Sequence, residues 1–173
     1  MISKKMADAL NTHMNLELYS AHLYLSMSSC CNEKGLKGAA NWFFVQYREE
    51  MIHFIKFYTY LVDQGIIITL QASKAVPNSY KSLLEMFEKT LAHEQLITGC
   101  INELSEQAVK EKDHATQIFL QWFVTEQIEE ENNDRDLIAK LKLVGDNGYG
   151  ILMIDSEMAA RVFVAPPGTL LAV

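Results

Sequence analysis

Residues 39–64 read AANWFFVQYREEMIHFIKFYTYLVDQ, a run without glycine or proline that stops at Gly65. A set of mostly apolar side chains recurs in it at steps of three and four residues, and a few polar side chains keep the same register. This is the spacing of one face of an α-helix. That face contains Phe43, Gln46, Glu50, His53, Phe57 and Leu61. The stretch therefore predicts a long helix whose otherwise apolar face has a carboxylate and an imidazole near its centre.

Three further segments show the same spacing, and each has an acid near the middle of its inner face. The predicted helices cover residues 5–32, 39–64, 82–109 and 114–144, and their acids are Glu17, Glu50, Glu94 and Glu130. Glycines or a cluster of charged residues separate these segments, as is typical of helix ends. We therefore expect an all-α protein built on four long helices.

The lengths of the connections predict how these helices are arranged. The links between the first and second helices and between the third and fourth are short, so each pair should be antiparallel. Residues 65–81 can extend by about 3.3 Å each, so this link can run along the full length of a neighbouring helix, which is about 39 Å. This predicts a four-helix bundle with one long crossover and parallel second and third helices. A short fifth helix is expected over residues 151–162, ended by Pro166-Pro167-Gly168.

The composition is that of one globular domain, and it limits the partners. Only 8 of the 173 residues are glycine and 3 are proline, which disfavours a turn-rich β-sandwich or barrel. We expect a single domain over 1–173, with the bundle at 5–144 and an apolar tail at 163–173. The net charge of −7 disfavours nucleic-acid and anionic-membrane partners and favours cations.

The location is predicted from what the sequence lacks. We find no signal sequence and no apolar run of about 18 residues that could span a membrane. The three cysteines show no C-x-x-C spacing, which suits a reducing compartment. We therefore expect a cytoplasmic protein.

The four acids need compensation if their helices pack together. Burying a carboxylate costs several kcal/mol, and four at one level also repel one another. The predicted inner faces contain no lysine or arginine as a counter-charge. One such acid alone would more often lie on a solvated face, but four at similar depth favour a shared site. The sequence therefore indicates that these acids bind protons or external cations.

The stretch Glu50-Met51-Ile52-His53 adds an imidazole one turn from a carboxylate on the same helix face. The other four histidines have no comparable setting. Several carboxylates with one imidazole suit iron or manganese better than structural zinc or copper. With Glu50 central enough to bridge two ions, the candidate ligands of a dinuclear centre are Glu17, Glu50, His53, Glu94 and Glu130.

Several segments carry motifs of a known family. They are MNLELYS at 14–20, EEMIH at 49–53, HEQLIT at 93–98, and FLQW at 119–122 with EQIEEE at 126–131. In these segments the chain resembles the bacterial non-haem ferritins, and the resemblance extends from the start of the chain to about Ala160. The resemblance implies an iron-storage ferroxidase that oxidises Fe(II) with O2 or H2O2. It also implies a homo-oligomer of twenty-four subunits that forms a hollow shell and holds Fe(III) mineral.

The same resemblance implies roles for the central residues. It gives Glu17, Glu50 and His53 to a first iron ion, with Glu50 bridging to a second. The second iron ion would be held by Glu94 and Glu130.

Further residues are assigned by the resemblance around that pair. Gln127 would lie beside the second ion. A third iron position would use Glu49, Glu126 and Glu129 and share one ligand, Glu130, with the second. Tyr24 corresponds to a tyrosine near the site, which either lends an electron or only packs and hydrogen-bonds.

Bacterioferritins are nearby relatives that carry Glu-x-x-His on both the second and the fourth helix and bind haem through a methionine. Met51 stands where that methionine would be. The fourth segment, however, reads Gln127-x-x-Glu130 without a histidine. We therefore expect a non-haem site without haem, with Met51 as the one feature that keeps haem as an alternative.

Other functions stay open from the sequence. A non-catalytic buffer of iron or other divalent metals would use the same ligands without fast oxidation. A rubrerythrin-like redox enzyme is disfavoured, because the chain has no cysteine pairs for an additional iron site. A purely structural helical protein would have no use for the inward acids.

Overall fold

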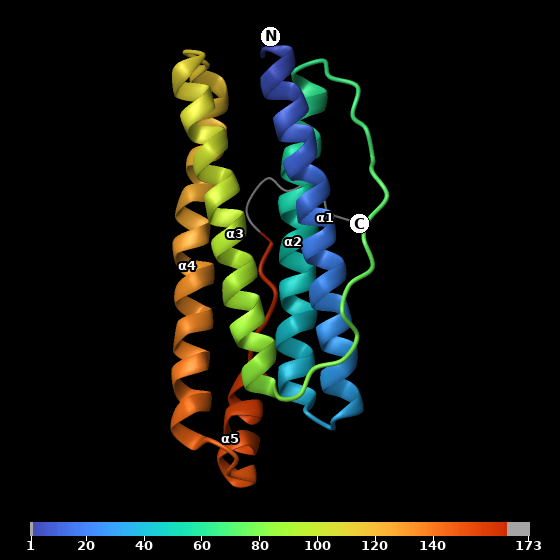
Figure 1. Ribbon diagram of the computed structural model, residues 1–173, viewed down its shortest axis with the longest axis vertical. Helices are drawn as coiled ribbons and strands as arrows, with labels where there is room; N and C mark the ends of the chain where they lie inside the picture. The colour runs from blue at the N-terminus through green and yellow to red at the C-terminus, as the bar shows by residue number, and fades with distance from the viewer. Residues whose placement is uncertain (1, 166–173) are drawn as a thin grey trace.

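The computed structural model describes residues 2–165, whose regular structure is entirely α-helical. The helices are α1 Lys4–Glu33, α2 Lys37–Asp63, α3 Leu83–Lys110, α4 His114–Val144 and α5 Gly148–Met158. The first four form an elongated bundle, and α5 lies at one end of it, against α2 and α4 (Figure 1). The predicted bundle with a short fifth helix is confirmed. None of these helices is long and apolar enough to cross a membrane.

The ends of the helices follow from capping residues in the sequence. Ser3, Ser82 and Asp113 each precede a helix, and each side chain accepts a hydrogen bond from the backbone N–H three residues on. After α2, Gly65 takes a φ of +75°, a left-handed conformation that costs glycine no strain. Gly65 therefore ends α2, as its position in the sequence predicts.

Residues 64–82 join α2 to α3 and run the length of the bundle beside α1 (Figure 1). Asn11 and Asn15 of α1 each accept a backbone N–H bond from this crossover at 2.8 Å. Farther along, the Ser26 hydroxyl donates to a crossover carbonyl at 2.7 Å. Because the crossover returns the chain to the starting end of α2, the helices α2 and α3 are parallel, as predicted.

Two apolar clusters form the core and leave a polar layer between them. The cluster at the α5 end is centred on Phe43 and Phe87, whose rings stack with centroids 5.0 Å apart. The cluster at the other end is centred on Phe57 and Phe123, with centroids 4.4 Å apart. The polar layer falls between these clusters along each of the four helices, and its acids are Glu17, Glu50, Glu94 and Glu130.

The helix α5 packs closely on the start of α2. A Cβ atom built on Gly38 would lie 1.6 Å from the carbonyl oxygen of Asp155. The backbone N–H of Ala39 donates to Asp155 Oδ1 at 2.8 Å. Glycine at position 38 therefore allows the backbone of α2 to approach α5 at this point.

The bounds of α5 differ from the sequence prediction of 151–162. The helix begins at Gly148, because the Asn147 side chain accepts a hydrogen bond from the Gly150 N–H and so places both glycines in the first turn. It ends at Met158, where the backbone tightens into bonds between residues three apart. The predicted stop at Pro166-Pro167-Gly168 and most of the apolar tail lie outside the described residues.

Candidate metal centre

All four acids predicted to face inward are buried in the middle of the bundle. Glu17, Glu50 and Glu94 are 1–2% exposed, and Glu130 is 5% exposed. Each comes from a different helix of the bundle. The helical phases inferred from sequence spacing are therefore correct at these positions.

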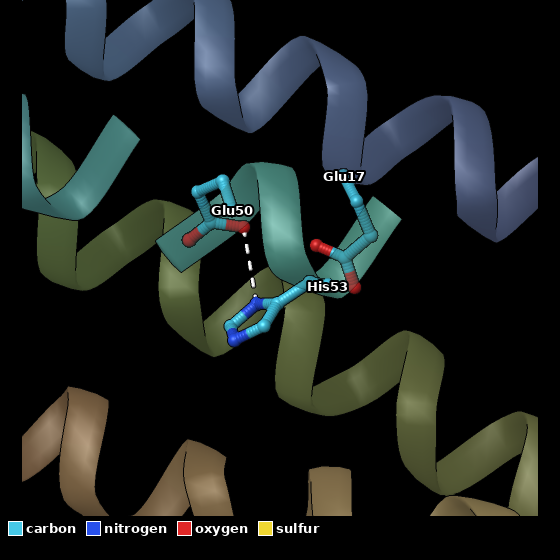
Figure 2. A group of neighbouring side chains, drawn as sticks. All are labelled: Glu17, Glu50 and His53. Carbon is cyan, nitrogen blue, oxygen red and sulfur yellow. Dashed lines mark ion pairs between the residues drawn. The ribbon is translucent and has the colours of Figure 1, made fainter. Parts of the chain in front are cut away.

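One compact group of potential ligands consists of Glu17, Glu50 and His53 (Figure 2). One ligand atom of each side chain lies within 4.8 Å of those of the other two. His53 Nδ1 is 3.3 Å from Glu50 Oε2, and Glu17 reaches toward this pair from α1 (Figure 2). Glu17 Oε2 is buried and has no hydrogen-bond partner within residues 2–165. A bound cation would satisfy that oxygen, so the residues present fit a metal ion.

A second group shares the same imidazole. Ligand atoms of His53, Glu126 and Glu130 also lie within 4.8 Å of one another. Gln46 Nε2 donates to Glu130 Oε2 at 2.8 Å, which fixes that carboxylate from the side of α2. The two groups form a continuous set of carboxylate oxygens with one imidazole, a donor set that suits iron or manganese.

Glu94 belongs to neither group, and both of its carboxylate oxygens accept hydrogen bonds. The Tyr24 hydroxyl donates to Glu94 Oε1. Gln127 Nε2 donates to Glu94 Oε2 at 3.0 Å. These contacts bring Tyr24 and Gln127 to the layer of acids and compensate part of the cost of burying Glu94.

The remaining two acids of the implied third position lie apart from these groups. Glu49 forms an ion pair with Arg161, which follows α5. The Arg161 guanidinium also lies over the Trp42 ring, 4.3 Å from its centroid. Glu129 is exposed and belongs to neither group. Of the three flanking acids, the structure brings only Glu126 into contact range of the central donors.

The buried acids favour their protonated forms. Burial raises the pKa of Glu50 well above its usual range, and the charges of Glu94, Glu17 and Glu130 raise it further. Burial and the Glu94 charge raise the pKa of Glu130 to about 8. Burial also raises the pKa of Glu94 to about 7, against the effect of its hydrogen bonds. Without a cation, the layer therefore holds protons at pH 7 that an incoming metal ion would displace.

His13 is a partner of the site that the sequence reasoning missed. It is buried on α1, with Nε2 2.7 Å from Glu17 Oε1. Burial would raise the pKa of Glu17, but the charge and the hydrogen bond of His13, together with the effects of His53 and Glu50, outweigh burial and lower that pKa. Burial would likewise lower the pKa of His13, but Glu17 and Cys100 together raise it to about 9. The expectation that no side chain inside the bundle compensates the acids is therefore wrong for Glu17. The four-residue spacing of His13 and Glu17 was the available signal.

Asp134 is a further buried acid on the inner face of α4, beyond the four acids assigned to the polar layer. It lies one turn beyond Glu130 on α4 and is 1% exposed. Its Oδ2 has no hydrogen-bond partner among the described residues. Burial and the Glu130 charge raise the pKa of Asp134 to about 8. The polar layer therefore extends one turn toward α5.

Comparison with known proteins agrees with this geometry. A family model described as a ferritin-like domain matches residues 7–144. The chain is 45% identical to a bacterial non-heme ferritin of Campylobacter jejuni over 90% of this chain and 93% of the relative. It is 42% identical to a bacterial non-heme ferritin of Escherichia coli O157:H7, over 92% and 96% of the two chains. A solved open pore ferritin from Archaeoglobus fulgidus superposes with a TM-score of 0.92 at 43% sequence identity. The match covers 94% of this chain and 99% of the ferritin chain.

Proposed function

This chain belongs to the ferritin family, and from that premise we propose that it stores iron and oxidises Fe(II) as a ferroxidase. Fe(II) is the substrate of the proposed reaction, and O2 or H2O2 is the oxidant. The observation that carries the proposal is the buried group Glu17, Glu50 and His53, whose ligand atoms lie within 4.8 Å of one another.

We assign the central ligands to two iron positions. Glu17, Glu50 and His53 hold the first ion, and Glu50 bridges to the second. Glu94 and Glu130 hold the second. Because both Glu94 oxygens accept hydrogen bonds, binding there requires Glu94 to exchange at least one of them for the ion.

The third position proposed here uses the three flanking acids. Glu126 supports it best, since it already lies beside His53 and Glu130. Glu49 would have to leave its ion pair with Arg161, so its contribution depends on how Arg161 moves. Glu129 is exposed and would have to turn inward.

In this mechanism the protein exchanges protons for cations. Glu50 and Glu130 hold protons at pH 7 because of burial and mutual repulsion, and Fe(II) displaces those protons. The resulting carboxylate oxygens favour the harder Fe(III), which helps the oxidation step. Gln127 steadies Glu94 from α4. Tyr24 donates directly to Glu94, so an electron lent by this tyrosine would pass to the site without an intervening residue.

We also propose an assembly of twenty-four copies into a shell, with Fe(III) mineral inside and with the whole chain acting as one domain. The similarity to solved ferritins over nearly the whole chain supports this. A charge of −7 on each copy would draw Fe(II) toward the shell. We place the protein in the cytoplasm and assign it no haem, since α4 carries Gln127-x-x-Glu130.

Rapid mixing of the assembled, iron-free protein with Fe(II) in air tests the dinuclear site. Glu50→Ala and His53→Ala should lose the fast phase of oxidation. Glu33→Ala, an exposed acid at the end of α1, is the matched control and should keep it. An unchanged fast phase in both site variants would overturn the assignment.

Two further measurements separate the finer claims. Glu129→Ala should change the ratio of iron oxidised to oxygen consumed while the first fast phase stays, and an unchanged ratio would remove Glu129 from the third position.

Size-exclusion chromatography after iron loading in air tests storage. A shell-sized particle should gather far more iron than its fixed sites can bind. Binding without fast oxidation or mineral would instead indicate a metal buffer.

A further inference from the structure

A cavity of about 270 Å³ lies between α1 and α3, outside the layer of acids. Three side chains with metal-binding atoms line it, namely His13, Cys100 and Glu103. Leu16 and Leu104 supply part of its apolar wall. None of these residues is a ligand of the dinuclear site proposed above, although His13 contacts one of its ligands, Glu17.

His13 turns an unpartnered nitrogen away from the layer of acids. The side chain is 3% exposed, and its Nε2 is occupied by Glu17 Oε1 at 2.7 Å. The other ring nitrogen, Nδ1, is buried and has no hydrogen-bond partner within residues 2–165. An unpaired buried ring nitrogen costs free energy in either protonation state. A ligand in the cavity would remove that cost.

The arrangement of His13 is the one found in metal sites. A histidine that binds a metal through one nitrogen commonly donates the other N–H to a carboxylate, which fixes the ring and its tautomer. Glu17 provides that carboxylate here. Once a cation displaces the proton from Nδ1, the lone pair of that nitrogen can bind the cation.

Cys100 and Glu103 supply the complementary ligands. Cys100 is a free cysteine with intermediate exposure, and its thiol is close enough to act on the pKa of His13. Glu103 lies one turn farther along α3, is exposed, and forms no ion pair with another described residue, so its side chain can swing toward the cavity.

We propose that His13 Nδ1, Cys100 Sγ and the Glu103 carboxylate bind one divalent ion of borderline softness, such as Zn(II) or Co(II), in this cavity. A thiolate, an imidazole and a carboxylate form a set that Zn(II) and Co(II) take readily, in contrast to the oxygen-rich central layer. On binding, His13 Nδ1 and the Cys100 thiol each release one proton to solvent, and the nitrogen and the thiolate then form bonds to the metal. Through His13, the ion would also hold the Glu17 carboxylate in place.

Anaerobic titration of the assembled, iron-free protein with Co(II) tests the site, because a cobalt–thiolate bond gives a charge-transfer absorption that carboxylates do not. We expect one such site per chain, and Zn(II) should remove the band by displacing Co(II). The band should vanish in Cys100→Ser and persist in Cys30→Ser, the matched control at a buried cysteine. His13→Gln should weaken Co(II) binding by at least about tenfold.

The Glu50→Ala protein separates this proposal from the ferroxidase assignment. It should lose fast Fe(II) oxidation and keep the cobalt–thiolate band, since the two sites share no ligand. Absence of the band in the unmodified protein, or a band of full intensity in Cys100→Ser, would overturn the cavity site whatever the oxidation assay shows.

Discussion

Asp134→Asn should stabilise the metal-free protein, and the gain should depend on pH. Asp134 is 1% exposed, and its Oδ2 lacks a partner among residues 2–165. Burial and the charge of Glu130 raise its pKa from the usual 3.8 to about 8. Asparagine has the same shape without the ionisable group, so the substitution removes the cost of the charge and leaves the packing unchanged.

The magnitude follows from the two pKa values. Below pH 3.8 the carboxyl is protonated in both the folded and the unfolded chain, so the substitution should be nearly neutral. As the pH rises toward 8, the unfolded carboxyl ionises while the folded one keeps its proton, and the stability of the unmodified protein falls. At about 1.4 kcal/mol per pH unit over roughly three units, the cost approaches about 4 kcal/mol at pH 7.

Denaturant unfolding of both proteins, iron-free and at a series of pH values from 4 to 8, measures this difference. The advantage of Asp134→Asn should grow with pH and level off near pH 8. Asp136→Asn is the matched control, because Asp136 is exposed on the same helix, and it should change stability by less than about 0.5 kcal/mol. If Asp134→Asn is no more stable than the unmodified protein at pH 7, the carboxylate has a partner and the reasoning fails.

Two further substitutions test contacts that hold the bundle together. Gly38→Ala should lower stability by about 3 kcal/mol in thermal or denaturant unfolding, because its Cβ would clash with a backbone carbonyl of α5. Gly99→Ala has no atom within 4 Å of the new Cβ and should gain roughly 0.5–1 kcal/mol, and equal stability of the two variants would contradict the close contact. Glu94→Leu leaves the Tyr24 and Gln127 donors without their acceptor, so the iron-free variant should be less stable than Glu94→Gln by about 1–3 kcal/mol. Equal stability would show that both donors find other partners.

The fold could be predicted from the sequence because local pattern and global arrangement agree. The inner faces of the four helices repeat at three and four residues without interruption, so their phases were correct. The crossover at 65–81 is long enough to run the whole length of the bundle, which predicts that α2 and α3 are parallel. The start of α5 differs from the predicted start at residue 151 because glycine favours helices weakly, whereas the Asn147 cap draws Gly148 and Gly150 into the first turn.

The features of the candidate site that the sequence did not predict depend on contacts between different elements of the fold. The sequence showed that Glu17 faces inward, but whether His13 is buried depends on its packing against Phe57, with ring centroids 4.7 Å apart. The pairing of Glu49 with Arg161 joins residues far apart in the chain and depends on how the segment after α5 returns to α2. Spacing along one helix predicts which face a residue occupies. It does not predict which side chain from another element meets it.

Packing alone does not favour a layer of acids in the middle of the core. Replacing buried charged groups by well-packed apolar side chains is often neutral or stabilising. The three inward acids whose pKa is raised in the fold, Glu50, Glu94 and Glu130, therefore lower the stability of the metal-free bundle near pH 7. The apolar clusters on both sides, with stacked rings such as Tyr60 and Phe119 at 4.1 Å, allow the fold to tolerate this. Those clusters also exclude water from the donors, so the carboxyl groups hold protons and thereby avoid the repulsion between ionised carboxylates. A divalent ion that replaces the protons removes the repulsion and satisfies oxygens such as Glu17 Oε2, and the unfavourable layer thereby becomes a source of cation affinity.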